Sequence, residues 1–91
     1  MIKLMPNYGP LLGIMRYHFK DRHCFFQVDV RATLFNNKYN NIVSNTNRLY
    51  IMLREMNRIK KIEYCPIIEI IKFLPNVDYT IYEREFNKYI Y

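Results

Sequence analysis

The chain has 91 residues, a mass of 11.3 kDa, a formal net charge of +6 and a sequence pI of about 9.4. Hydrophobic residues make up 51% and charged residues 24%, which excludes a disordered chain because enough apolar side chain is present to bury. A chain this short buries only about 60% of its unfolded surface, so its own core is small. The sequence predicts one domain over residues 1–91, with an irregular arm over 1–9 and a folded body over 10–91.

Several classes of protein are excluded by what the sequence lacks. No run approaches the roughly 20 apolar residues of a membrane span. Two cysteines are too few for a disulfide framework. The N-terminal stretch resembles neither a signal peptide nor a transit peptide. Isoleucine, asparagine, tyrosine and lysine are abundant, and their codons are rich in A and T, which indicates the genome of an organelle or a virus.

The first predicted element is a helix over Leu11–Lys20. Pro10 can precede it at the first helical position, where the missing N–H costs nothing. Arg16 and Lys20 would lie outside, opposite a buried apolar stripe. The stripe comprises Leu11, Leu12, Ile14, Met15 and Phe19.

A half-buried strand is predicted over Cys24–Phe35, because apolar and polar residues alternate there with a period of two. The apolar positions are Phe26, Val28, Val30, Ala32 and Leu34. The following segment, Asn36–Asn47, predicts a polar loop because asparagine favours turns.

The segment Arg48–Tyr64 fits two structures. As a helix it would be capped by Ser44 or Thr46 and would place its apolar residues on one face, and its propensity favours this form. These residues are Leu49, Met52, Leu53, Met56, Ile59 and Ile62. As strands, it would form two runs joined by a turn near Glu55–Arg58.

The last part of the chain predicts two short elements. Pro66–Leu74 is apolar and fits either a strand or two helical turns. After it, Asn76 or Asp78 can cap a final helix over Tyr79–Tyr89. One side of this helix would carry Ile81, Glu85 and Lys88, and another side Tyr82, Phe86 and Tyr89.

No catalytic, cofactor or metal site is predicted. His18, His23 and Cys24 are close in sequence, but they lack the paired spacing of zinc ligands, and Cys65 stands far away. The carboxylates form no acid–base pair, and two glycines are too few for a loop that holds phosphate.

Basic residues form two groups, one of Arg16, Lys20 and Arg22 and one of Arg54, Arg58, Lys60 and Lys61. With nine tyrosines and six phenylalanines interspersed, they are typical of a surface that binds ribosomal or other RNA. The alternative is a solvated surface whose lysines reflect codon use.

The C-terminal sequence NVDYTIYEREFNKYIY is the most specific string in the chain. Its core Tyr82-Glu83-Arg84-Glu85, followed by Phe86 and Tyr89, resembles the signature of the NuoC-type subunit of respiratory complex I. This family is also called mitochondrial NADH dehydrogenase subunit nine or the thirty-kilodalton subunit. FFQVDVRATLF (Phe25–Phe35) is similar to a strand of the family, and NRLYIMLREMNRIKKIEY (Asn47–Tyr64) to its hairpin. The chain would be a highly diverged member, shortened or split, with Lys88 in place of the acid of the signature.

The resemblance implies an α+β fold, in which an N-terminal and a C-terminal helix pack on a small antiparallel sheet. It also implies a hairpin rather than a helix over Arg48–Tyr64. The protein would be a non-catalytic accessory subunit, without a cofactor, that braces other subunits of NADH:ubiquinone oxidoreductase on the matrix side of the mitochondrial inner membrane. Its partner-interface residues would be Tyr82, Glu83, Arg84, Glu85, Phe86 and Tyr89. A basic mitochondrial ribosomal protein and a viral protein that binds a host factor are the alternatives.

Overall fold

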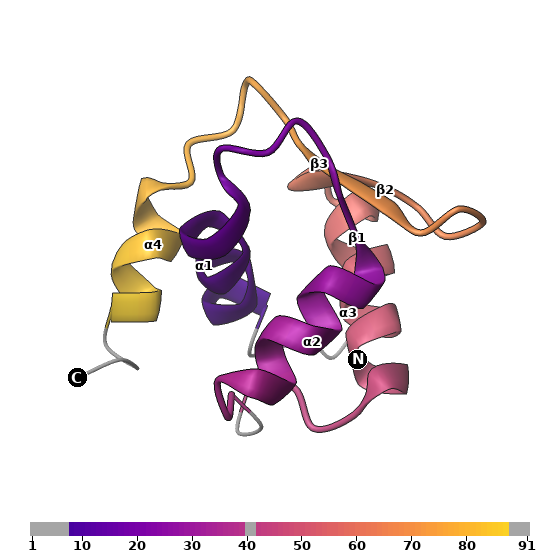
Figure 1. Ribbon diagram of the computed structural model, residues 1–91. Coiled ribbons are helices and arrows are strands. Elements are labelled where there is room, and N and C mark those ends of the chain that lie inside the picture. Colours follow the sequence, from indigo (N-terminus) through magenta and orange to yellow (C-terminus); the bar gives the residue numbers. More distant parts are fainter. Residues whose placement is uncertain (1–7, 40–41, 88–91) are drawn as a thin grey trace, which may run out of the picture.

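The computed structural model describes residues 8–39 and 42–87 and has an α+β fold, which confirms the predicted class (Figure 1). The described part of the chain contains four helices and three short strands, and the strands form one antiparallel sheet. The elements are α1 (Tyr8–Phe19), β1 (Phe25–Phe26), α2 (Gln27–Asn36), α3 (Thr46–Arg58), β2 (Ile62–Cys65), β3 (Ile70–Phe73) and α4 (Thr80–Asn87). No helix in these ranges is both long and apolar enough to cross a bilayer.

Helix α1 confirms the first predicted helix and forms the centre of the core. All five residues of the predicted stripe are buried, and Lys20 is exposed just beyond the helix. Arg16, which was also predicted to lie outside, is instead half-buried because its guanidinium packs over Phe73 and Tyr79. The helix begins at Tyr8, so Tyr8 and Gly9 belong to it and not to the predicted irregular arm, of which residues 1–7 lie outside the described residues. Burying this continuous apolar stripe stabilises the helix more than Gly13 weakens it.

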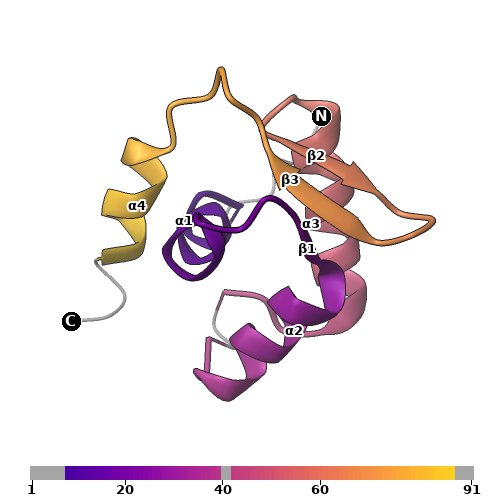
Figure 2. The same ribbon diagram turned by 45° about the horizontal axis from the view of Figure 1, so that its top comes forward.

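Helix α4 packs directly on α1, on the side away from α3 (Figures 1 and 2). A Cβ on Gly13 would lie 2.3 Å from the carbonyl oxygen of Tyr82 and 2.7 Å from the Cβ of Phe86, so only glycine allows this approach. Asp78 caps α4, since its Oδ1 accepts a hydrogen bond from the backbone N–H of Thr80 at 3.0 Å. The predicted end of this helix at Tyr89 lies outside the described residues.

The predicted strand over Cys24–Phe35 is wrong, because the strand stops at Phe26 and α2 follows at once. The buried residues of α2 are Gln27, Val30 and Leu34, whose spacing of three and four is helical. The alternation of apolar residues predicts burial of Val28, which is instead exposed. A buried polar residue and exposed apolar ones conceal the helical period in the sequence.

Helix α3 confirms the helical alternative for the first part of Arg48–Tyr64, and the hairpin implied by the resemblance is wrong. Its cap is neither Ser44 nor Thr46: Asn45 Oδ1 accepts a hydrogen bond from the backbone N–H of Arg48 at 2.8 Å. The predicted loop before it, Asn36–Asn47, is confirmed only in part. Helices α2 and α3 include its two ends, and two of its described residues are buried. These buried residues are Ile42 and Val43.

The sheet has the order β1-β3-β2, with β2 and β3 forming a hairpin. Of the two structures predicted for Pro66–Leu74, the strand is confirmed over Ile70–Phe73. Phe25 and Tyr64 flank Ile71 in the register, and this row faces the core. A buried hydrogen bond between the Tyr64 hydroxyl and Gln27 Oε1 joins the sheet to α2. The sheet therefore holds α2 in place.

Candidate nucleic-acid interface

Helix α3 divides into an apolar face and a polar face. Its buried side comprises Leu49, Met52, Leu53 and Met56. On the opposite side, a stripe of exposed residues follows at spacings of four, three and four. It comprises Asn47, Ile51, Arg54 and Arg58, and we call it the outer stripe of α3. A helix with one fully apolar face must pack that face inward, so the outer stripe points away from the core.

Two arginines of the outer stripe are positioned by neighbours on the same helix. The guanidinium carbon of Arg54 lies 5.4 Å from the ring centroid of Tyr50. Arg58 donates from Nε to Glu55 Oε1 at 3.1 Å and from Nη2 to Oε2. These hydrogen bonds hold the pKa of the Glu55 carboxyl below its usual range. Arg54 has no carboxylate within ion-pair distance among the described residues, so its charge is available to a ligand.

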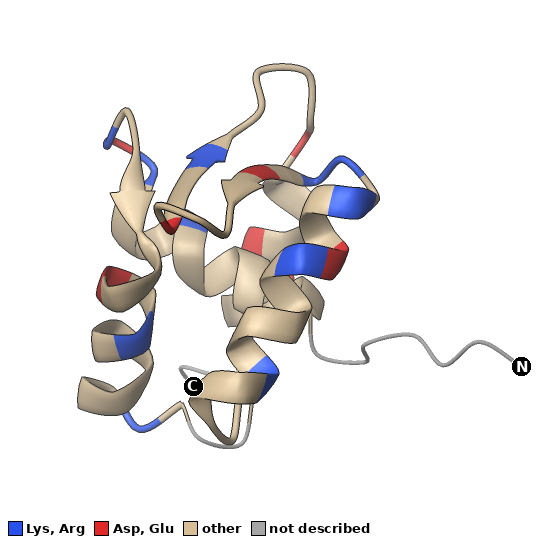
Figure 3. Cartoon of the chain, turned by 90° about the vertical axis from the view of Figure 1, so that its right-hand side faces the viewer, with Lys and Arg blue, Asp and Glu red and all other residues tan. Residues whose placement is uncertain are grey.

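Figure 3 turns the right-hand side of Figure 1 toward the viewer, so that α3 is seen from outside the molecule. Basic positions are spaced along the helix, and an acidic position lies beside one of them. Lys60 is exposed just after the helix and extends this basic surface. Lys61 differs, since its Nζ lies 5.8 Å from the ring centroid of Tyr82. Of the four basic residues of the predicted cluster, Arg54, Arg58 and Lys60 therefore share the surface of α3, and Lys61 does not.

The second predicted basic group does not form a single surface. Arg16 is half-buried, and its guanidinium carbon lies 4.7 Å from the ring centroids of both Phe73 and Tyr79. Its Nε also lies 3.4 Å from Glu83 Oε2. Lys20 is exposed beyond α1. Arg16 therefore serves the packing of the fold rather than a ligand.

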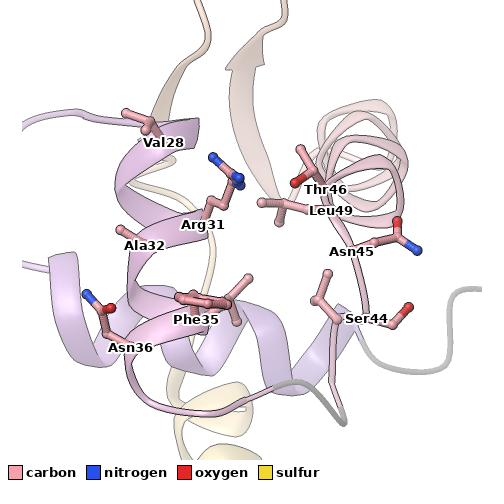
Figure 4. Close-up of a pocket in the computed structure, with 11 residues that line it drawn as sticks. Val28, Arg31, Ala32, Phe35, Asn36, Ser44, Asn45, Thr46 and Leu49 are labelled. Atoms are coloured by element: carbon pink, nitrogen blue, oxygen red, sulfur yellow. The ribbon is translucent and has the colours of Figure 1, made fainter.

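A groove of about 450 Å³ separates α2 from the start of α3. Figure 4 shows Val28, Arg31, Ala32 and Phe35 on the α2 side and Thr46 and Leu49 on the α3 side. The Arg31 side chain extends from α2 toward α3 (Figure 4). It brings a further positive charge close to the N-terminal end of the outer stripe.

Four of the six predicted partner-interface residues lie against α1 of the same chain, namely Tyr82, Glu83, Glu85 and Phe86. Phe86 is 1% exposed, and its ring centroid lies 5.3 Å from that of Tyr17. Tyr82 lies 6.3 Å from Tyr8 by ring centroids. The carboxylate of Glu83 pairs with Arg16, Glu85 lies beside Gly9, and Arg84 is exposed. Tyr89 lies outside the described residues, and contact of these side chains with another subunit stays a prediction.

The residues considered as metal ligands or nucleophiles lie apart. Within residues 8–39 and 42–87, no three His, Cys, Asp or Glu side chains gather in a group that could hold a metal ion. Cys24 and Cys65 are free thiols, and Cys65 is exposed. His18 stacks edge-on against Tyr17 and Tyr39, and burial lowers its pKa. This environment favours a neutral packing residue.

Sequence reasoning found Arg54 and Arg58 but missed Asn47, Ile51 and Arg31. The signal for the first two was present in the helical alternative, because they lie opposite its apolar face. Arg31 lies on α2, in a segment whose alternating pattern predicts a strand, so the sequence does not place it near α3. No family model, curated protein or solved structure matches this chain.

Proposed function

We propose that this chain binds double-stranded DNA and places the outer stripe of α3 in the major groove. The observation that carries the proposal is this solvent-facing helix side, with an asparagine and two arginines beside a single paired carboxylate. The major groove is about 12 Å wide and admits one α-helix, whose diameter with side chains is about 10–12 Å. In this groove arginine forms paired hydrogen bonds with guanine, and asparagine forms them with adenine.

The order of the elements supports the same function. A helix, a strand, two helices and a hairpin, with sheet order β1-β3-β2, is the arrangement of winged helix-turn-helix domains. In those domains the helix corresponding to α3 enters the major groove. The connection between α2 and α3 is longer than the three or four residues of the simplest helix-turn-helix. Topology alone does not determine function, so the proposal rests on the outer stripe.

Duplex DNA fits this surface better than duplex RNA. The major groove of A-form RNA is too deep and narrow for side chains to read its bases. The outer stripe contains no aromatic residue that could stack single-stranded bases, and the ring of Tyr50 beside it is partly covered by Arg54. The net charge of +6 supports binding to either polymer.

The test is a titration of the full chain into a fluorescent duplex of mixed sequence, followed by anisotropy over about 50–200 mM salt. We expect affinity to fall steeply with salt because phosphate contacts release counterions. Arg54→Ala should weaken binding by about 10-fold and Arg31→Ala should reduce the salt slope by about 1. Arg84→Ala is the matched control, since it removes the same charge from α4 on the opposite side of α1.

Two results would overturn the proposal. One is an equal loss of affinity for Arg54→Ala and Arg84→Ala, which would mean that binding depends only on the net charge of the protein. The other is tighter binding to duplex or hairpin RNA of the same sequence, which would support the RNA-associated protein predicted from composition. Unchanged far-UV circular dichroism of each variant establishes that it is folded.

Membership of respiratory complex I stays a separate proposal, supported by the resemblance of Tyr82-Glu83-Arg84-Glu85 to the NuoC-type signature. The other two stretches of that resemblance carry helices where the family has strands, which weakens the match. Copurification of the chain with NADH dehydrogenase activity after detergent extraction of mitochondria would support it. Sedimentation of the chain apart from that activity would argue against it.

A further inference from the structure

The outer stripe of α3 mixes three kinds of side chain at regular steps. Asn47 and Arg54 are exposed polar residues, and Ile51 lies between them with 47% of its surface exposed. Their spacing places all three on one line along the helix, about 6 Å and then about 4.5 Å apart along the axis. An apolar side chain in the centre of this polar line adds nothing to the core.

Each of the three side chains matches a different base edge in the major groove. Asparagine forms paired hydrogen bonds with adenine, arginine forms them with guanine, and an apolar side chain contacts the methyl group of thymine. The span from Asn47 to Arg54 is about 10.5 Å, which equals about three base-pair steps of 3.4 Å. The line can therefore contact about four neighbouring base pairs.

Resting on the proposed DNA binding, we infer that α3 reads a short base sequence and does not merely hold phosphates. Asn47 selects an A·T pair at one end of the site, Ile51 contacts a thymine methyl in the middle, and Arg54 selects a G·C pair at the other end. Arg58 differs from Arg54 because both of its bonds go to Glu55. Because that pair carries no net charge, the base readout is assigned to Asn47, Ile51 and Arg54 alone.

The experiment selects duplexes from a random library with the full wild-type chain, and then measures affinity for the selected sequence. Replacing the central thymine by uracil removes only the methyl group, and we expect a loss of about 4-fold, as for one buried methyl. Ile51→Ala should lose a similar factor on the thymine duplex and nothing further on the uracil duplex. Arg54→Ala should lose about 5- to 160-fold in discrimination at the G·C pair.

Arg31→Ala is the control, because a phosphate contact should weaken the selected and a scrambled duplex equally. If the library shows no enrichment while binding stays salt-dependent, the sequence readout is wrong and the proposed DNA binding stands. If uracil weakens wild type and Ile51→Ala equally, Ile51 does not contact the methyl. If the wild type binds no duplex at about 50 mM salt, the inference and the proposed function both fail.

Discussion

Helices α2 and α3 face each other across the groove of Figure 4, yet different interactions hold them. α3 buries four apolar residues and no polar one. α2 buries Gln27 with two apolar residues, and leaves Phe35 exposed over 77% of its surface. Amphipathic burial therefore specifies α3. The position of α2 depends more on individual polar contacts, of which the hydrogen bond between Gln27 and Tyr64 is the most buried.

The largest expected effect is the difference in stability lost when an apolar residue is removed from α3 and from α2. Leu53 of α3 is 0% exposed, so Leu53→Ala should lower the free energy of unfolding by about 2–5 kcal/mol. Phe35→Ala on α2 removes a larger side chain but should change it by no more than about 0.5 kcal/mol. Urea denaturation followed by circular dichroism measures both. A loss above about 2 kcal/mol for Phe35→Ala would show that α2 uses its outer apolar side in folding.

The bond between α2 and the sheet should come next in size. Tyr64→Phe removes the hydroxyl and leaves Gln27 Oε1 buried without its partner, at a cost of about 1–3 kcal/mol. The double variant Gln27→Met/Tyr64→Phe removes both polar groups and should recover most of the loss. If the double variant is as unstable as the sum of the single variants, the hydrogen bond does not hold α2.

The same tyrosine predicts a loss of stability in alkali. Burial, followed by the charge of Glu69, raises the pKa of Tyr64 to about 12, above the value of about 10 in an unfolded chain. The folded state therefore disfavours the phenolate. The contribution of Tyr64 is fully present below pH 10 and is lost as the pH rises through 12. Between pH 9 and pH 11, the urea midpoint should fall less for Tyr64→Phe than for wild type. An equal fall in both proteins would show that the loss of stability in alkali does not come from Tyr64.

The cap of α3 gives a smaller and local effect. Asn45→Ala removes the oxygen that accepts the N–H of Arg48, and should cost about 1 kcal/mol. Ser44→Ala is the matched control at the neighbouring exposed position and should leave the urea midpoint unchanged. Equal losses in the two variants would mean that the loop, and not the cap, sets the start of the helix.

The same contrast decides what the sequence could predict. α1 and α3 could be predicted because their buried residues are all apolar and follow a helical period. α2 could not, because its helical period includes Gln27, whose partner Tyr64 is distant in the sequence. The candidate site divides in the same way. Arg54 and Arg58 stood out by charge, whereas Asn47 and Ile51 gain meaning only from the direction in which α3 buries its other face.

The smallest expected effect concerns the start of α2. Asp29 Oδ2 accepts a hydrogen bond from the backbone N–H of Phe26 at 2.9 Å, and its charge lies near the positive end of the helix. Asp29→Ala should lower the free energy of unfolding by about 0.5 kcal/mol, less than Asn45→Ala, because the N–H that Asp29 accepts belongs to the cap residue Phe26, whereas Asn45 accepts an N–H of the helix itself. Asp29→Asn keeps an acceptor oxygen and should lose only the part due to charge, which about 0.5 M salt should screen. If Asp29→Ala instead costs more stability than Tyr64→Phe, then the first turn of α2 holds this helix, and the buried bond to the sheet does not. The contrast with α3 would then disappear, because each helix would depend on its own first turn.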